Sequence, residues 1–215
     1  MSLPQDDVRD ITIGELAPAA IYKLLISLVV PRPIAWVASL SPAGIANLAP
    51  HSYFMILATD PAILGFSSVG TKDTLRNIQA TGEYVINIAG EELAERLNLS
   101  SGDFPPEESE YAWAGLTPAA SLTVAPPSVA EAPVAFEMRL LHVTPYGNQP
   151  NHHIVGEVSH IRVRESILAP GGEYADPARL RAIGRMGGPT YSRTTDLFNL
   201  DRPRYADLVK QGRPG

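Results

Sequence analysis

Prolines and glycines interrupt this chain so often that it can hold few long helices. The 20 prolines and 17 glycines make up 37 of the 215 residues, and they are spread between short apolar runs. Proline removes a backbone donor and fixes φ, and glycine favours tight turns, so both end regular elements. We therefore expect a mainly β fold with peripheral helices, built from short strands joined by turns.

Apolar runs of strand length recur along the chain. We expect strands at residues 34–40, 45–49, 62–67, 84–88, 134–143 and 154–164, with turns at 41–44 and 144–150. Sequential strands joined by short turns pair antiparallel. The simplest architecture is a closed or partly closed barrel, and we expect one domain over residues 1–215, with a loop excursion at 100–106.

Helical spacing and helix-end signals predict four short helices. They cover residues 20–28, 71–80, 91–97 and 176–183. Either Thr71 or Asp73 could cap the second helix and Gly82 could stop it, whereas Asp176 followed by Pro177 is typical of a helix start.

Composition excludes several classes of function. A formal charge of -6 argues against nucleic-acid partners, which need a basic face, and the chain has no cysteine for disulfides or thiolate chemistry. Residues 1–7 lack the basic start and apolar run of a leader, and Pro31, Arg32 and Pro33 break the most apolar stretch. We expect a cytoplasmic protein without membrane contact, whose redox chemistry would need a bound cofactor.

Histidines offer the first candidate for metal ligation, but their spacing is poor. His152 and His153 are adjacent in a predicted strand, so their side chains point to opposite faces. No zinc-ligand string accompanies them, and no nucleophile elbow or phosphate-binding loop string occurs. We expect no metal site, and we expect Trp36 to pack in the core.

Two stretches carry polar groups at strand ends. Residues 47–52 place Asn47 and Ser52 around a bend stiffened by Pro50, where nearby backbone donors could face a planar polar ring. Residues 66–74 bring hydroxyls, Lys72 and a helix start together, which favours an anion such as phosphate. The alternative is that the hydroxyls only cap the helix and Lys72 is solvated.

The order and spacing of several motifs resemble the flavin reductase-like, FMN-binding split-barrel family that includes flavoredoxin. The resemblance extends from residue 22 to 203 and is weakest over 90–132. Its motifs are residues 32–39 (RPIAWVAS), 47–54 (NLAPHSYF), 66–67 (FS), 72–74 (KDT), 77–78 (NI), 81–87 (TGEYVIN), 156–158 (GEV) and 187–194 (GGPTYSRT).

This resemblance implies a six-stranded Greek-key barrel that forms a homodimer with FMN at the subunit interface. It places one group of residues around the isoalloxazine and ribityl groups: Ser39, Asn47, Ala49, Pro50 and Ser52. It places a second group toward the phosphate: Ser67, Lys72, Asp73 and Thr74. Tyr191 and Arg193 would reach the flavin region, and the partner subunit could supply them.

The implied activity is that of an NAD(P)H-dependent flavin reductase, in which the flavin accepts hydride and the protein supplies no catalytic base. The electron donor would be NADH or NADPH, and the acceptor a monooxygenase, another redox protein or a small molecule. A flavoprotein electron carrier with little NAD(P)H activity needs the same pocket and remains an alternative. A third hypothesis is a protein with the same barrel fold that binds no ligand and functions in protein interactions.

Overall fold

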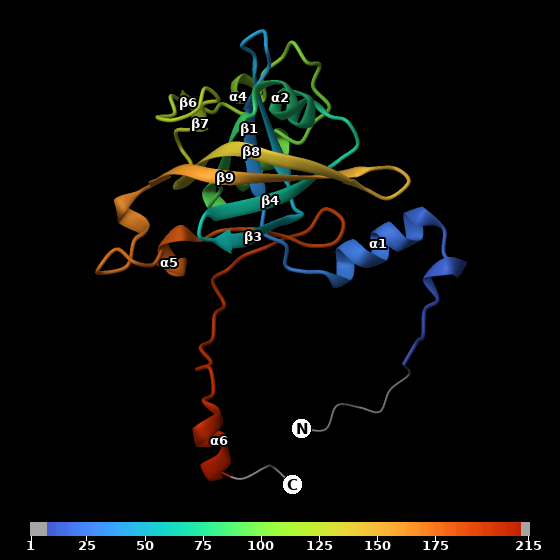
Figure 1. The fold of residues 1–215 in the computed structure, drawn as a ribbon, viewed down its shortest axis with the longest axis vertical. Coiled ribbons are helices and arrows are strands. Elements are labelled where there is room, and N and C mark those ends of the chain that lie inside the picture. Colours follow the sequence, from blue (N-terminus) through green and yellow to red (C-terminus); the bar gives the residue numbers. More distant parts are fainter. Residues whose placement is uncertain (1–7, 212–215) are drawn as a thin grey trace.

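A computed structural model describes residues 8–211 of the chain. Seven antiparallel strands form its main sheet, in the order β2-β1-β5-β8-β9-β4-β3 (Figure 1). The strands are β1 (Ala35–Leu40), β2 (Ala46–His51), β3 (Phe54–Thr59), β4 (Ala62–Val69), β5 (Glu83–Ile88), β8 (Val134–Tyr146) and β9 (Asn151–Val163). Two small two-stranded sheets pair β6 (Pro118–Ala119) with β7 (Ser128–Val129) and β10 (Gly184–Arg185) with β11 (Tyr191–Ser192).

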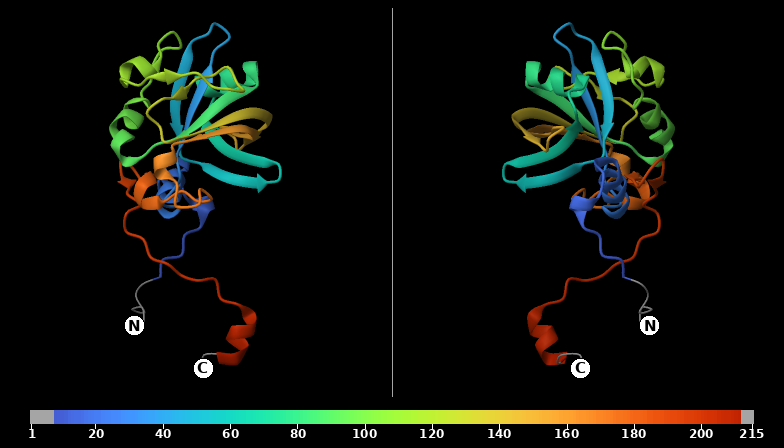
Figure 2. Two further views of the ribbon diagram at one scale, coloured as in Figure 1. Left: turned by 90° about the vertical axis from the view of Figure 1, so that its left-hand side faces the viewer. Right: turned by 90° about the vertical axis from the view of Figure 1, so that its right-hand side faces the viewer.

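The helices are short and lie around the sheet (Figures 1 and 2). The α-helices are α1 (Pro18–Leu28), α2 (Asp73–Thr81), α3 (Ala94–Leu99), α4 (Glu110–Trp113), α5 (Pro177–Leu180) and α6 (Tyr205–Gln211). Three further single turns are 3-10 helices, at Ile13–Glu15, Glu91–Leu93 and Glu165–Ile167. The predicted mainly β fold with peripheral helices is confirmed.

The two edge strands of the sheet, β2 and β3, are consecutive in the chain. A corner at Ser52 and Tyr53 joins them, and there the Ser67 N–H donates to the Tyr53 carbonyl over 2.9 Å. The chain itself therefore brings the two ends of the sheet together into a partly closed barrel. The sequence prediction did not include β3, and with it the sheet has seven strands.

Apolar side chains on the two faces of β1 form two cores. Ala35 and Val37 point into a core inside the barrel, together with Phe66 and Tyr84. Trp36 points to the opposite face, and its exposed fraction is zero. The expectation that Trp36 packs in the core is confirmed.

The segment that follows α3 covers the Trp36 face of β1. Its buried side chains include Tyr111 and Val129, and the Trp36 indole N–H donates to Ser100 Oγ over 2.9 Å. Residues 100–106 are irregular, as predicted, but the chain beyond them supplies α4 and the small β6–β7 sheet. The excursion thus gives β1 and β5 a second buried face.

The sequence predicted the end of helix α2 correctly but not its start. Gly82 ends the helix in the left-handed region, with φ 73°, as expected. At the other end the N-cap residue is Lys72, and no side chain caps the helix. The prediction that Thr71 or Asp73 caps α2 is therefore wrong, because the Asp73 carboxylate binds Arg76 instead.

Two other predicted helices change at their ends. Asp176 caps α5 as expected, with its carboxylate accepting from the Ala178 N–H over 2.9 Å. The helix stops at Leu180 rather than 183, because Arg181 takes a left-handed conformation with φ 45°. The helix predicted at 91–97 is a 3-10 turn continued by α3.

Residues 1–7, on which the absence of a leader was argued, lie outside the described residues. Within residues 8–211, no helix has both the length and the apolar character that crossing a membrane requires.

Candidate functional site

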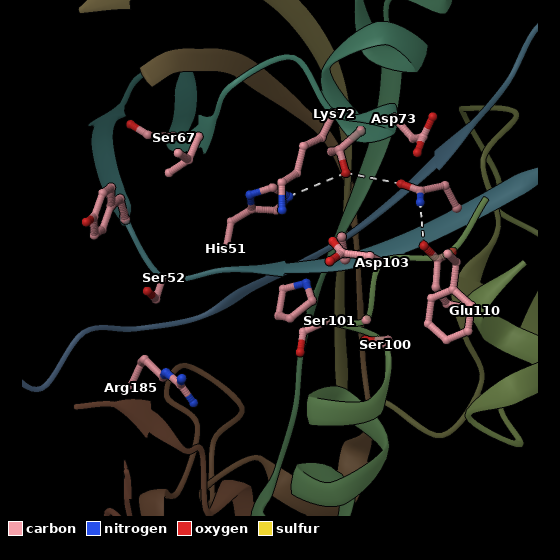
Figure 3. Close-up of a pocket in the computed structure, with 18 of the residues that line it drawn as sticks. His51, Ser52, Ser67, Lys72, Asp73, Ser100, Ser101, Asp103, Glu110 and Arg185 are labelled. Carbon is pink, nitrogen blue, oxygen red and sulfur yellow. Dashed lines mark hydrogen bonds between the residues drawn. The ribbon is translucent and has the colours of Figure 1, made fainter. Parts of the chain in front are cut away.

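A cavity of about 450 Å³ opens beside the corner between β2 and β3. Strand β2 and the start of α2 form one side of it, and residues 100–104 and the chain around β10 form the other (Figure 3). Such a volume is within the usual range for small-molecule and cofactor sites. The polar side chains that line it include Asn47, His51, Ser52, Lys72, Thr74, Glu110 and Arg185.

The cavity brings together eight of the eleven residues that the sequence predicted for the site. They are Asn47, Ala49, Pro50, Ser52, Ser67, Lys72, Asp73 and Thr74. A neighbouring cavity of about 120 Å³ shares Pro50, Ser52 and Arg185 with it and is lined by Tyr191.

Two of the predicted residues line neither cavity. Ser39 is fully buried behind Asn47, with its hydroxyl 3.4 Å from Asn47 Oδ1. Arg193 forms an ion pair with Glu91, and its side chain is 72% exposed. Ser39 could therefore act on a ligand in the cavity only through Asn47, and Arg193 does not reach either cavity in this chain.

A buried polar network connects β2 to α2 across the cavity floor (Figure 3). The Glu110 carboxylate accepts from Asn47 Nδ2 over 2.6 Å, and Asn47 Oδ1 accepts from the Thr74 hydroxyl over 3.1 Å. Thr74 Oγ1 also lies 3.4 Å from His51 Nε2. Both ends of the Asn47 amide are therefore bonded to protein, so this residue shapes the cavity by holding α2 against β2.

The exposed edge of β2 is blocked near the cavity by residues of α4 and its N-cap. The Leu48 N–H donates to Glu110 Oε2 over 2.8 Å, and the Ala46 carbonyl accepts from the Ser109 hydroxyl over 2.6 Å. Pro50 has no N–H to offer. The Leu48 donor, which the sequence left available for a ligand, thus belongs to Glu110, and burial raises the pKa of that carboxyl.

His51 is neutral at physiological pH. Burial and the nearby Lys72 charge lower its pKa from 6.5 to about 4, against a hydrogen bond to the Ser67 backbone that raises it. Its ring packs on Phe66 with centroids 4.9 Å apart. The neutral imidazole adds no second positive charge beside Lys72. It lines the cavity, with its Nε2 within 3.4 Å of Thr74 Oγ1.

The start of α2 is suited to an anion. Lys72 is the N-cap residue, and with no side-chain cap the first N–H groups of the nine-residue helix remain free of protein side chains. The Asp73 carboxylate, which would repel an anion, is paired with Arg76. The donors and the positive helix end therefore face the cavity together with Lys72.

Arg32 is a buried guanidinium that holds the cavity wall together. It donates to the carbonyls of Ile26, Val29 and Met186, the last over 2.9 Å, and only 7% of the residue is exposed. These bonds fix the end of α1 and the chain after β10 against the barrel. Arg32 therefore acts as a structural residue beside the site.

Sequence reasoning missed Glu110, His51 and Arg185 as site residues, and it included Arg32 only as part of the RPIAWVAS motif. Glu110 and Arg185 come from segments far from the predicted motifs and reach the cavity only through the fold. His51 lies inside the 47–54 motif, so its position next to Pro50 was an available signal.

The histidines of β9 have different environments, as expected for neighbours in a strand. His153 Nδ1 lies 3.1 Å from Ser67 Oγ, whereas His152 Nδ1 is buried without a hydrogen-bond partner. Among residues 8–211 no group of three or more His, Asp or Glu side chains is placed to hold a metal ion.

Comparison with protein families decides the relationship of the chain. The model of the flavin reductase like domain matches residues 27–178, which include β1 to β9 and most of the cavity wall. The chain belongs to the flavin reductase-like family. The resemblance seen in the sequence is thereby confirmed, and the general activity class is that of a flavin-linked oxidoreductase.

Solved structures extend this relationship to the fold. The chain is 32% identical to nitrilotriacetate monooxygenase component B from Bacillus cereus, covering 91% of this chain and 100% of that one, with a TM-score of 0.86. It is also 32% identical to the 2-nitrobenzoate 2-nitroreductase NbaA of Pseudomonas fluorescens, covering 92% and 98%, with a TM-score of 0.85. A flavin reductase with a split barrel domain from Shewanella frigidimarina is 21% identical, covers 89% and 96%, and has a TM-score of 0.80. The split-barrel fold is therefore shown.

Proposed function

We propose that this flavin reductase-like protein binds FMN in the 450 Å³ cavity and acts as an NAD(P)H-dependent flavin reductase. The observation that carries the proposal is the uncapped start of α2 with Lys72, which faces a largely polar cavity. Relatives that are 32% identical, a monooxygenase component and a nitroreductase, support a redox function.

The residues present fit such a cofactor. Lys72 and the free N–H groups at the start of α2, that of Thr74 among them, would hold the phosphate, with Ser67 beside them. Ala49, Pro50 and Ser52 would lie along the ring system, and Asn47 would support it through its bonds to Glu110 and Thr74. Asp73 would contribute through its backbone, because its carboxylate is paired with Arg76.

FMN supplies the hydride-accepting chemistry when bound, so the protein has only to bind and orient it and keep one face open. Neutral His51 and the Glu110 network hold the cavity floor in one arrangement, which lowers the entropic cost of binding. No general base is needed among these side chains.

Anaerobic mixing of the FMN-loaded protein with NADH or NADPH tests the activity. We expect bleaching of the visible flavin absorbance, followed by its return when air is admitted. A protein that binds FMN but shows no bleaching with either nucleotide would contradict the reductase activity and favour the electron carrier. A colourless protein that takes up no added FMN would contradict both functions and favour the interaction protein.

We also propose that the protein acts as a homodimer and passes electrons to a small molecule, a redox protein or a monooxygenase. Strand β3 is a sheet edge that exposes three consecutive apolar side chains, Met55, Ile56 and Leu57. Helix α1 buries no residue, and the chain after β11 leads away from the barrel with Phe198 84% exposed (Figures 1 and 2). Apolar sheet edges of this kind are normally covered.

Light scattering is expected to give a mass twice the 23.1 kDa of the chain. Ile56→Lys should shift the mass toward the monomer, because it places a charge on the apolar edge of β3. Leu122→Lys is the matched control, since Leu122 is also exposed but lies on the loop between β6 and β7. A wild-type mass of 23.1 kDa would contradict the dimer.

A further inference from the structure

Four cationic side chains line the main cavity, and two of them are already committed to protein partners. Arg76 is bonded to Asp73 and to the Thr71 carbonyl, the latter over 2.9 Å. Arg32 donates to backbone carbonyls, as described above. The other two, Lys72 and Arg185, have no hydrogen bond or ion pair from their charged groups to any described residue, so their charge is available to a ligand.

Arg185 is held in place by its backbone and its flank. Its N–H and carbonyl both pair with Arg32, over 2.8 and 3.0 Å. The next turn of chain is packed so closely on α1 that a Cβ at Gly187 would lie 3.1 Å from Ser27 Cβ. The guanidinium stacks over the Tyr191 ring, 4.4 Å from its centroid, and the Tyr191 hydroxyl donates to Asn98 over 3.1 Å. A guanidinium stacked on one face keeps its N–H groups directed outward in its plane.

Lys72 and Arg185 lie at opposite ends of the cavity, with Ser52 on the Arg185 side (Figure 3). The smaller 120 Å³ cavity opens at the Arg185 end, between Ser52, Ser101 and Tyr191. A flavin whose phosphate lies at Lys72 therefore leaves an oriented cation and additional space at the far end. One phosphate cannot satisfy two cations placed in this way.

We propose that Arg185 binds the anionic group of a second small molecule, the redox co-substrate that meets the flavin. The chemistry it recognises is a carboxylate or phosphate oxyanion, which matches the planar fork of a guanidinium. The group could belong to the phosphates of a pyridine nucleotide or to a carboxylate of an electron acceptor. The inference rests on the proposed FMN orientation, with the phosphate at Lys72.

The test compares Arg185→Gln with the wild-type protein, both loaded with FMN. Glutamine retains the backbone pairing with Arg32, so we expect the melting temperature and FMN affinity to stay near the wild-type values. One arm measures KM for NADH and NADPH beside the rate with N-benzyl-dihydronicotinamide, a hydride donor without a phosphate. The other arm follows the flavin spectrum during titration with benzoate and with its neutral analogue benzamide.

We expect Arg185→Gln to weaken the binding of one of the two anions by about tenfold or more, the usual effect of losing a charge-assisted contact. The rate or affinity measured with the neutral analogue of that anion should stay unchanged. A raised KM for the nucleotides assigns the site to phosphate, and a raised dissociation constant for benzoate assigns it to a carboxylate. Arg185→Lys should recover part of the loss, because it restores the charge without the fork.

Two comparison variants complete the design. Lys72→Ala should give the opposite result, with FMN affinity about tenfold or more lower. Arg202→Gln is the matched control, because Arg202 is an exposed arginine that lines neither cavity. Wild-type affinity for both anions in Arg185→Gln, or the absence of anion binding in the FMN-loaded wild type, would overturn this inference alone. Failure of the wild type to bind FMN would instead overturn the proposed function.

Discussion

Replacing Glu110 with alanine is expected to lower the free energy of unfolding by about 3 kcal/mol and to weaken FMN binding. The carboxylate is buried, with 4% of the residue exposed, and it accepts from both Asn47 Nδ2 and the Leu48 N–H. Removing it leaves the buried Leu48 N–H and the half-buried Asn47 amide without their acceptor, and it frees Asn47 to leave Thr74. Urea denaturation of the FMN-free protein measures the first effect, and FMN titration measures the second.

Glu110→Gln separates hydrogen bonding from volume. The glutamine oxygen can still accept from Asn47, but its NH2 group would face the Leu48 N–H, two donors in contact. We expect an intermediate loss of about 1–2 kcal/mol. Glu107→Ala, at an exposed position before α4, is the control for removing a glutamate. Wild-type stability in Glu110→Ala would show that the network does not hold β2 to α2.

Acidification of the FMN-free protein is expected to cost about 3 kcal/mol of stability through His51 alone. In the unfolded chain His51 takes up a proton near its ordinary pKa of 6.5, whereas in the folded protein its pKa is about 4. Between these values the unfolded state binds more protons, so stability falls as the pH falls through this window and levels off below it.

Denaturation of wild type and His51→Gln across pH 7 to pH 4 isolates this contribution. The difference between the two proteins should shrink or reverse by about 3 kcal/mol toward low pH. Subtraction is needed because burial raises the pKa of Glu110, whose proton uptake favours the folded state over an overlapping range. An imidazole signal of His51 that titrates near its ordinary pKa of 6.5 in the folded protein would contradict the expectation.

Local sequence signals predicted the elements that depend on local physics. The alternation and length of the apolar runs located β1, β8 and β9, and glycine at position 82 predicted where α2 ends. Strand β3 was missed because its apolar residues face solvent on a sheet edge, so burial does not give the segment an alternating pattern. Capping of α2 was predicted wrongly because the Asp73 side chain had a competing partner, Arg76, one turn along the helix.

The site also contains residues that the sequence predicted and residues that only the fold revealed. Residues 47–54 and 72–74 carry a compact pattern along the chain, and the fold brings most of the predicted members to one cavity. Glu110 and Arg185 carried no comparable signal, because their importance depends on partners 63 and 153 positions away, Asn47 and Arg32. Residue type and spacing do not predict which hydrogen-bond donors will contact a buried carboxylate such as that of Glu110.

By itself, the sequence determined a mainly β chain, its family and the polar stretches from which a flavin pocket could be built. Turn formers, apolar periodicity and motif spacing act over a few residues, so they can be read directly from the chain. Only the tertiary structure decided that Asn47 is bonded at both ends and that His51 is buried and neutral. It also decided that the Arg185 guanidinium lies over Tyr191 and has no hydrogen bond or ion pair to any residue among 8–211. Burial and charge pairing are properties of residues brought together from distant segments, and they exist only once the barrel has closed.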